Sequence, residues 1–148
     1  MYRIAISNQA KSFKINRNLI RRAVHMILKQ AGVETAEISV AIVDDPTIAQ
    51  IHEQYLGEPD PTDVLSFLLE KGDRHLEGEI VVSADTAAGW ANRVGWSAEH
   101  ELLLYIVHGT LHLVGFDDQS QPERRKMRRE EKVVLRELGI SIPYRSHP

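Results

Sequence analysis

The chain of 148 residues contains no cysteine. Disulfide bonds are therefore excluded, and any zinc ion must be held by nitrogen and oxygen ligands, which agrees with a reducing compartment. The sequence also has no apolar run long enough to span a bilayer, and the segment from Met1 to Ser7 lacks the apolar stretch of a signal peptide. We therefore expect a cytoplasmic protein with neither a membrane partner nor a disulfide partner.

What the chain does contain is typical of a globular protein. Hydrophobic residues make up 43% of it and charged residues 26%. The length suits one domain with a sizeable core, and no long linker or internal repeat divides the sequence. We therefore expect a single domain over residues 1–148, and the sequence indicates no particular oligomeric state.

Charge is unevenly distributed along the chain, although the net charge is only −3. Residues 1–33 carry seven Lys and Arg and no acidic residue, residues 34–118 carry three against seventeen Asp and Glu, and residues 119–148 carry eight against four. Basic ends around an acidic middle form a nucleic-acid face if the fold brings the ends together. Charge alone favours the simpler interpretation, in which the basic residues lie on two solvated helical faces.

The hydrophobic pattern switches between the period of a strand and that of a helix. The short turn at residues 71–73 favours an antiparallel hairpin, whereas the first two strand–helix units favour parallel crossovers. We therefore predict an α+β fold, with a mixed four-stranded sheet packed against about five helices. Strands are expected at 2–7, 38–43, 64–69 and 79–83, and helices from the cap at Asn16 to Gln30, from Asp44 or Asp45 to about Tyr55, from Ser83 or Asp85 to Val94, over about 98–114, and from Gln121 or Pro122 to Leu138.

One predicted helix carries two histidines at a metal-binding spacing. His108 and His112 are four residues apart, so a helix places both imidazoles on one face. The helix over 98–114 is apolar nearly all round and should be buried, where an unpaired imidazole costs about 1–3 kcal/mol. Gly115 ends the helix, so the chain can fold back and bring Asp118 in as a third ligand. Three ligands with one open position are typical of catalytic zinc sites, and we predict one zinc ion here.

A pair of histidines at this spacing also occurs where each is simply hydrogen-bonded, but burial and the following Asp118 favour a metal site. Zinc proteases carry a glutamate directly after the first histidine, as general base. Gly109 stands there in this chain, so a protease of that kind is disfavoured. No catalytic base is assigned, and Asp117 is a candidate only for orienting a ligand.

Two longer motifs resemble the YbeY family of bacterial endoribonucleases. Residues 108–118, HGTLHLVGFDD, resemble the signature H-G-x-L-H-L-x-G-[YF]-D-H, and residues 61–67 match the motif P-T-D-V-L-S-F. Residues 78–80 resemble a G-D-I element, and Met127 with Glu130 resembles an M-x-x-E element of the final helix. The resemblance covers about residues 38 to 138.

The resemblance implies a metal-dependent, single-strand-specific endoribonuclease of ribosomal RNA maturation. Its partners would be ribosomal RNA and the small ribosomal subunit, and three histidines would bind its metal ion. Asp118 replaces the third histidine, which lowers the net charge of the site by one and weakens its attraction for a phosphodiester. Leu56, after Tyr55, replaces an arginine that contacts RNA phosphate in the family, which removes a bidentate contact.

These departures leave two alternative functions open: an RNA-binding protein of ribosome maturation with little or no nuclease activity, and a metal-dependent hydrolase of another substrate. The five cations within residues 124–129 either contact ribosomal RNA or form a solvated helix face that Glu130 and Glu131 partly balance. Asp63 and Ser66 either line the metal cleft or serve turn hydrogen bonding and strand packing.

Overall fold

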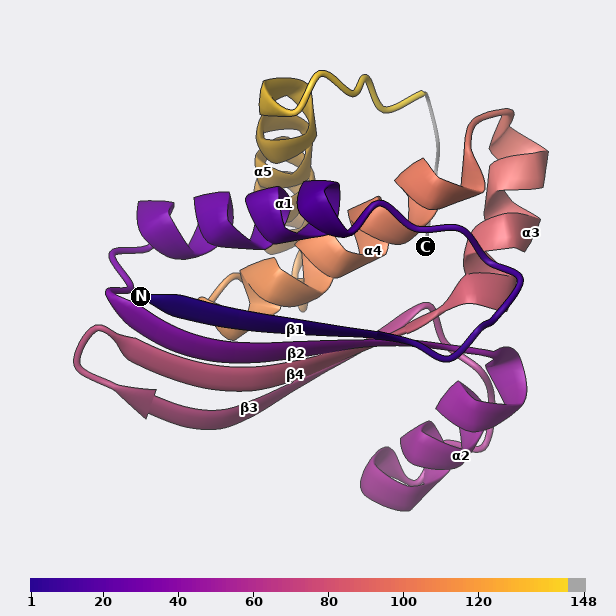
Figure 1. Ribbon diagram of the computed structural model, residues 1–148, viewed down its shortest axis with the longest axis horizontal. Coiled ribbons are helices and arrows are strands. Elements are labelled where there is room, and N and C mark those ends of the chain that lie inside the picture. The colour runs from indigo at the N-terminus through magenta and orange to yellow at the C-terminus, as the bar shows by residue number, and fades with distance from the viewer. Residues whose placement is uncertain (144–148) are drawn as a thin grey trace.

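Four strands form one mixed sheet in the computed structural model, which describes residues 1–143 (Figure 1). The strands at residues 2–8 and 75–83 both run parallel to the strand at 35–43, which lies between them. The strands at 64–72 and 75–83 form an antiparallel hairpin. The predicted α+β class and mixed sheet are therefore confirmed. The spatial order is β1 (Tyr2–Asn8), β2 (Thr35–Val43), β4 (His75–Ser83) and β3 (Val64–Gly72).

Residues 1–143 form five helices, each starting at a side chain that accepts a backbone N–H in its first turn. The first four contact the sheet, and the fifth packs on the first and the fourth. Figure 1 shows α1 and α4 across one face of the sheet and α2 on the other. No helix within residues 1–143 has both the length and the apolarity to cross a membrane. The helices and their caps are α1 (Arg17–Gln30, Asn16), α2 (Asp45–Leu56, Asp44), α3 (Ala84–Val94, Ser83), α4 (Ala98–Leu113, Ser97) and α5 (Gln121–Glu137, Ser120).

Helix α4 lies at the centre of the molecule. It contacts α1, α3, α5, β3 and β4, and most of its residues are buried. Its apolar side chains join the large core between the sheet and the helices, whereas α2 covers a smaller cluster on the opposite face of the sheet. A helix held on so many sides is a rigid support for the side chains it carries.

Helix α4 approaches the sheet closely at Gly109. A Cβ atom there would lie 2.9 Å from Oγ of Ser66, 3.0 Å from Cγ2 of Val64 and 3.1 Å from Cγ2 of Ile80. The hydroxyl of Ser66 also donates a 2.9 Å hydrogen bond to the carbonyl oxygen of Gly109. The glycine therefore sets the distance between α4 and β3.

The hairpin of β3 and β4 is longer than the sequence indicates. The predicted turn at residues 71–73 is wrong, because Lys71 and Gly72 still pair with β4 and the chain turns at Asp73 and Arg74. Arg74 adopts a positive φ of 61° to close that turn. The outer part of β3 is exposed, and Leu76 is the one large apolar residue in the outer part of β4, so the alternation of apolar residues that marks a strand is too short to be recognised there.

Candidate metal centre

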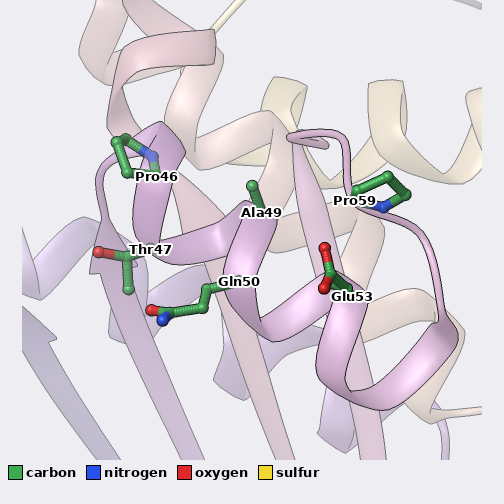
Figure 2. Close-up of a pocket in the computed structure, with 6 residues that line it drawn as sticks. All are labelled: Pro46, Thr47, Ala49, Gln50, Glu53 and Pro59. Atoms are coloured by element: carbon green, nitrogen blue, oxygen red, sulfur yellow. The ribbon is translucent and has the colours of Figure 1, made fainter.

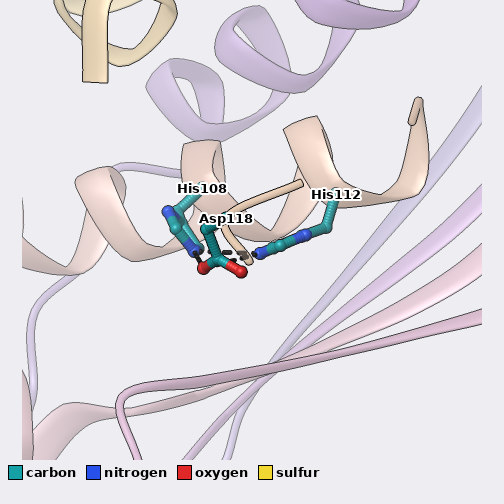
Figure 3. Close-up of side chains that lie close together, drawn as sticks. All are labelled: His108, His112 and Asp118. Atoms are coloured by element: carbon teal, nitrogen blue, oxygen red, sulfur yellow. Dashed lines mark hydrogen bonds and ion pairs between the residues drawn. The ribbon is translucent and has the colours of Figure 1, made fainter. Parts of the chain in front are cut away.

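The structure brings together the three residues that the sequence predicts as metal ligands (Figure 3). Nε2 of His108 lies 3.1 Å from Nε2 of His112. Oδ2 of Asp118 lies 3.4 Å from Nε2 of His108 and 3.3 Å from Nε2 of His112. Two imidazole nitrogens and one carboxylate oxygen therefore form a small triangle.

The size of this triangle fits a metal ion. Ligand atoms at 2.0–2.1 Å from a tetrahedral zinc ion are about 3.3–3.4 Å apart. The three measured separations lie close to this value, and all three side chains are partly buried rather than exposed. The group can therefore hold a zinc-sized ion on one triangular face and leave the fourth position open.

The chain after α4 is folded so that Asp118 returns to the histidines. Gly115 has a φ of 107°, which an L-residue with a side chain rarely adopts, and it redirects the chain after the helix end. Oδ1 of Asp117 accepts a 2.8 Å hydrogen bond from the backbone N–H of Asp118. The guanidinium of Arg124 donates to the carbonyl oxygen of Asp118 at 3.2 Å. Asp117 thus orients the candidate ligand through its backbone.

Glu131 on α5 supports the site from behind. Its Oε2 lies 2.6 Å from Nδ1 of His108, and the residue is only 9% exposed. When Nδ1–H donates to this carboxylate, the proton is kept on Nδ1 and the lone pair of Nε2 is left facing the triangle. A carboxylate in this position is typical of histidines that bind metal ions.

Sequence reasoning missed Glu131, because the motif comparison pointed to Glu130. The signal that identifies Glu131 is its spacing from Met127. Residues four apart share a helix face, so a carboxylate at 131 faces inward with the buried Met127. Glu130 is turned away from this face by about 100°.

The electrostatics around His108 shift the pKa of its imidazole upward when no ion is bound. Burial alone would lower the pKa of this imidazole, but the hydrogen bond to Glu131 and the negative charges of Glu131, Asp63 and Asp118 outweigh that effect and raise the pKa. A proton and a metal ion compete for the same nitrogen. The carboxylates that raise the pKa also attract a cation into the triangle.

The other sequence candidates have different positions. Asp63, directly before β3, acts on His108 through its negative charge. Ser66 holds β3 to α4 and is a packing residue. Leu56, at the position of the family arginine, is 58% exposed at the end of α2. The absence of room at Gly109 explains why no side chain can serve there as a general base.

Two other surface features differ from this site. A shallow hollow on α2 and the loop after it carries a single carboxylate, that of Glu53, and no histidine (Figure 2). Glu70, His75 and Glu77 form a second group with metal-ligand atoms, on the outer part of the hairpin, where Nε2 of His75 lies 2.8 Å from Oε2 of Glu77 and 3.4 Å from Oε2 of Glu70. This group is more exposed than the first, and its short contact has the geometry of an ion pair. The first of these features, the shallow hollow on α2, is lined by Pro46, Thr47, Ala49, Gln50, Glu53 and Pro59.

A family model described as endoribonuclease YbeY matches residues 5–139, which include all of the site. The chain belongs to the YbeY family. The resemblance inferred from the motifs at residues 61–67 and 108–118 is therefore confirmed. Individual YbeY proteins and one solved structure are also similar to this chain over most of its length.

Two YbeY relatives and one solved structure are similar over most of their length. An endoribonuclease YbeY from Desulfitobacterium hafniense is 40% identical over 131 residues, which is 82% of this chain and 82% of that protein. One from Geobacter sulfurreducens is 34% identical over 140 residues, covering 90% and 93%. The solution structure of a Thermotoga maritima protein superposes with a TM-score of 0.61 at 27% identity and covers 94% of this chain and 92% of the other.

Proposed function

We propose that this chain is a zinc-dependent endoribonuclease that cleaves single-stranded RNA during maturation of the RNA of the small ribosomal subunit, in the cytoplasm. Membership of the YbeY family supports RNA cleavage. The triangle of His108, His112 and Asp118 is the observation that carries metal dependence, because its three separations match the ligand spacing around one ion. We also propose that residues 1–148 form one domain.

The residues of the site have different roles. When bound, a zinc ion supplies Lewis acidity, which polarises a phosphoryl oxygen and makes water a better nucleophile. His108 and His112 are fixed on the buried α4 and would hold the ion through their Nε2 atoms. Glu131 holds the proton of His108 on Nδ1 and so keeps Nε2 available as a ligand.

Asp118 and Leu56 stand where the motif resemblance implies a histidine and an arginine, and they favour a second candidate function. A carboxylate ligand reduces the positive charge of the site, and an exposed leucine supplies no phosphate contact. Both changes lower the attraction for a phosphodiester. The second candidate is therefore a protein of ribosome maturation that binds RNA and cleaves it slowly or not at all.

Cleavage by metal-verified protein tests the first function against the second. Protein prepared without a histidine tag is analysed for zinc and incubated with end-labelled single-stranded and duplex RNA. We expect about one zinc per chain, cleavage of the single strand only, and loss of zinc and cleavage in His112→Ala. His25→Ala, an exposed histidine of α1, is the matched control and should retain both. RNA binding without cleavage by any form would support the second function.

A further inference from the structure

Helix α5 carries a one-sided row of positive charges that the metal centre does not use. Arg125, Arg128, Arg129, Lys132 and Arg136, here named the basic stripe, are all exposed. At about 100° per residue they fall within an arc of about 100° on the helix surface, over about three turns. The stripe therefore presents cations along one flank of α5.

The acidic residues of α5 do not neutralise this flank. Glu131 is turned inward and bonds to His108, so it cannot balance the stripe. Helix geometry places Glu123, Glu130 and Glu137 on the opposite flank, and Glu123 is engaged in the capping box with Ser120. The acidic residues of α5 therefore leave this flank positively charged.

The spacing within the stripe is unfavourable for an isolated helix. Arg125 and Arg129, Arg128 and Lys132, and Lys132 and Arg136 are like-charge pairs four residues apart, and each such pair destabilises a helix by about 0.2–0.5 kcal/mol. Within residues 1–143, no carboxylate forms an ion pair with a member of the stripe. A polyanion bound along the stripe would remove this repulsion.

We propose that the basic stripe is the surface on which this chain holds the phosphate backbone of its RNA. The inference rests on the proposed function and adds the docking surface to it. Glu131 joins the inner face of α5 to His108, so the helix that carries the stripe also borders the candidate metal centre. The stripe thus supplies cations to a chain that has Leu56 where its family has a phosphate-binding arginine.

RNA fits the stripe better than an anionic membrane. A helix that binds a membrane surface needs an apolar face beside its basic face. The apolar residues Met127, Val134 and Leu135 of α5 are buried in the core, and Val133 is the one large apolar residue of the helix, within the described part of the chain, that is clearly exposed. The stripe offers charge alone, which is what a phosphate backbone requires.

RNA binding without cleavage tests the stripe separately from the metal centre. A fluorescent single-stranded RNA of mixed sequence is titrated in EDTA at several KCl concentrations, with anisotropy as the readout. In Arg129→Gln/Lys132→Gln/Arg136→Gln, each lost phosphate contact costs about 5-fold in affinity near 0.1 M salt, or about 100-fold in total. The plot of the logarithm of the association constant against the logarithm of the KCl concentration has a negative slope, and its magnitude should decrease by about 2.

Matched variants define the outcomes. Arg3→Gln/Lys71→Gln/Arg74→Gln changes the net charge equally on the sheet and its hairpin, and it should bind RNA like the wild type. His112→Ala should lose zinc but keep RNA binding, so a failure of the metal centre is distinguished from a failure of the stripe. Equal RNA affinity of the two triple variants overturns the inference, as does stripe-dependent binding to phosphatidylserine vesicles with unchanged RNA binding.

Discussion

The carboxylate of Glu131 fixes which nitrogen of His108 is left free, although Glu131 is not itself part of the ligand triangle. At the scale of single residues, the site depends on such supporting contacts as much as on the ligands. Asp117 holds the backbone of Asp118, and Arg124 holds its carbonyl oxygen. Each of these contacts reduces the number of conformations that a bound ion would have to select.

Glu131→Gln should weaken zinc binding by about 10-fold, because outer contacts of metal-bound histidines contribute 10- to 100-fold to affinity. The neutral amide is a poorer acceptor for the N–H of His108 than the carboxylate. Zinc affinity is measured by competition with a fluorescent chelator. Glu130→Gln, which changes the same charge on a different face, should bind zinc normally. Equal affinity of both variants would show that Glu131 does not orient His108.

Asp118→Ala should reduce zinc affinity by more than Glu131→Gln does, because it removes a direct ligand. Asp118→His should restore the three-histidine set of the family and bind zinc more tightly than the wild type. Asp117→Asn is the control, since an amide oxygen can still accept the backbone N–H of residue 118. Full zinc occupancy in Asp118→Ala, measured by elemental analysis, would remove Asp118 from the ligand set.

At the scale of elements, the contact between α4 and β3 controls where the histidines stand. Gly109→Ala should cost about 1–3 kcal/mol, because the added methyl group meets Ser66 and two strand side chains at 2.9–3.1 Å. Gly89→Ala is the matched control. Gly89 lies within α3 with nothing within 4 Å of its added Cβ, so that change should stabilise the protein by about 0.5–1 kcal/mol.

Denaturant unfolding of both glycine variants, followed by circular dichroism, checks these opposite signs. A stable Gly109→Ala variant would mean that α4 can move away from β3 at little cost. Zinc affinity should also fall in that variant, because moving α4 shifts both histidines relative to Asp118 and Glu131. The same measurement on Gly89→Ala should show unchanged zinc affinity.

The sheet carries a second element-scale feature, a row of carboxylates across three strands. Glu37 and Glu70 both stand opposite Glu77 in the strand register, and like charges in such positions repel. The hydrogen bond to Glu77 raises the pKa of His75, and the same contact lowers the pKa of Glu77. A protonated His75 therefore offsets part of the repulsion.

These two pKa shifts predict the pH range over which the pairing of His75 with Glu77 stabilises the hairpin. The stabilisation of the folded state by His75 is complete below the pKa of this residue in the unfolded chain, about 6.5. It is lost as pH rises through the raised pKa of the folded state. The contribution of Glu77 is present above about 4.3 and is lost as pH falls through the lowered folded pKa. NMR titration of His75 should show a lower midpoint in Glu77→Gln, and no change in Glu79→Gln, whose side chain lies farther along the same strand. An unchanged midpoint in Glu77→Gln would contradict the pairing.

The helices could be predicted from the sequence better than the strands. Asn16, Ser97 and Gly95 mark helix ends directly, because caps and left-handed glycines are local features. The outer halves of β3 and β4 could not be predicted, since residues such as Glu70 and Glu77 interact mainly with neighbouring strands. Their pairing depends on contacts that no local pattern contains.

At the scale of the whole molecule, the candidate site combines local and distant parts. His108, His112 and Asp118 could be predicted, because one helix and one turn place them. Glu131 could not be assigned with equal ease, because its contact with His108 spans 23 positions in the sequence and depends on how α5 packs on α4. The basic stripe became visible only when packing showed which acidic residues face inward.

Zinc should stabilise the whole protein. An ion that binds the folded chain alone adds about 2.7 kcal/mol at a free concentration 100 times the dissociation constant. For a domain of this size the melting temperature should rise by about 5–10 °C. Differential scanning calorimetry with and without zinc checks this shift, which should disappear in His112→Ala and persist in His25→Ala. A shift of equal size in all three proteins would place the stabilising ion elsewhere.

The contact between Glu131 of α5 and His108 has a consequence for the synthesis of the protein. The ribosome makes α4 and the Asp118 turn before it makes Glu131, so a growing chain has the histidines for a time without the carboxylate that orients them. Such a chain lacks the basic stripe as well. The metal centre is therefore completed only once α5 has been made and has packed on α4.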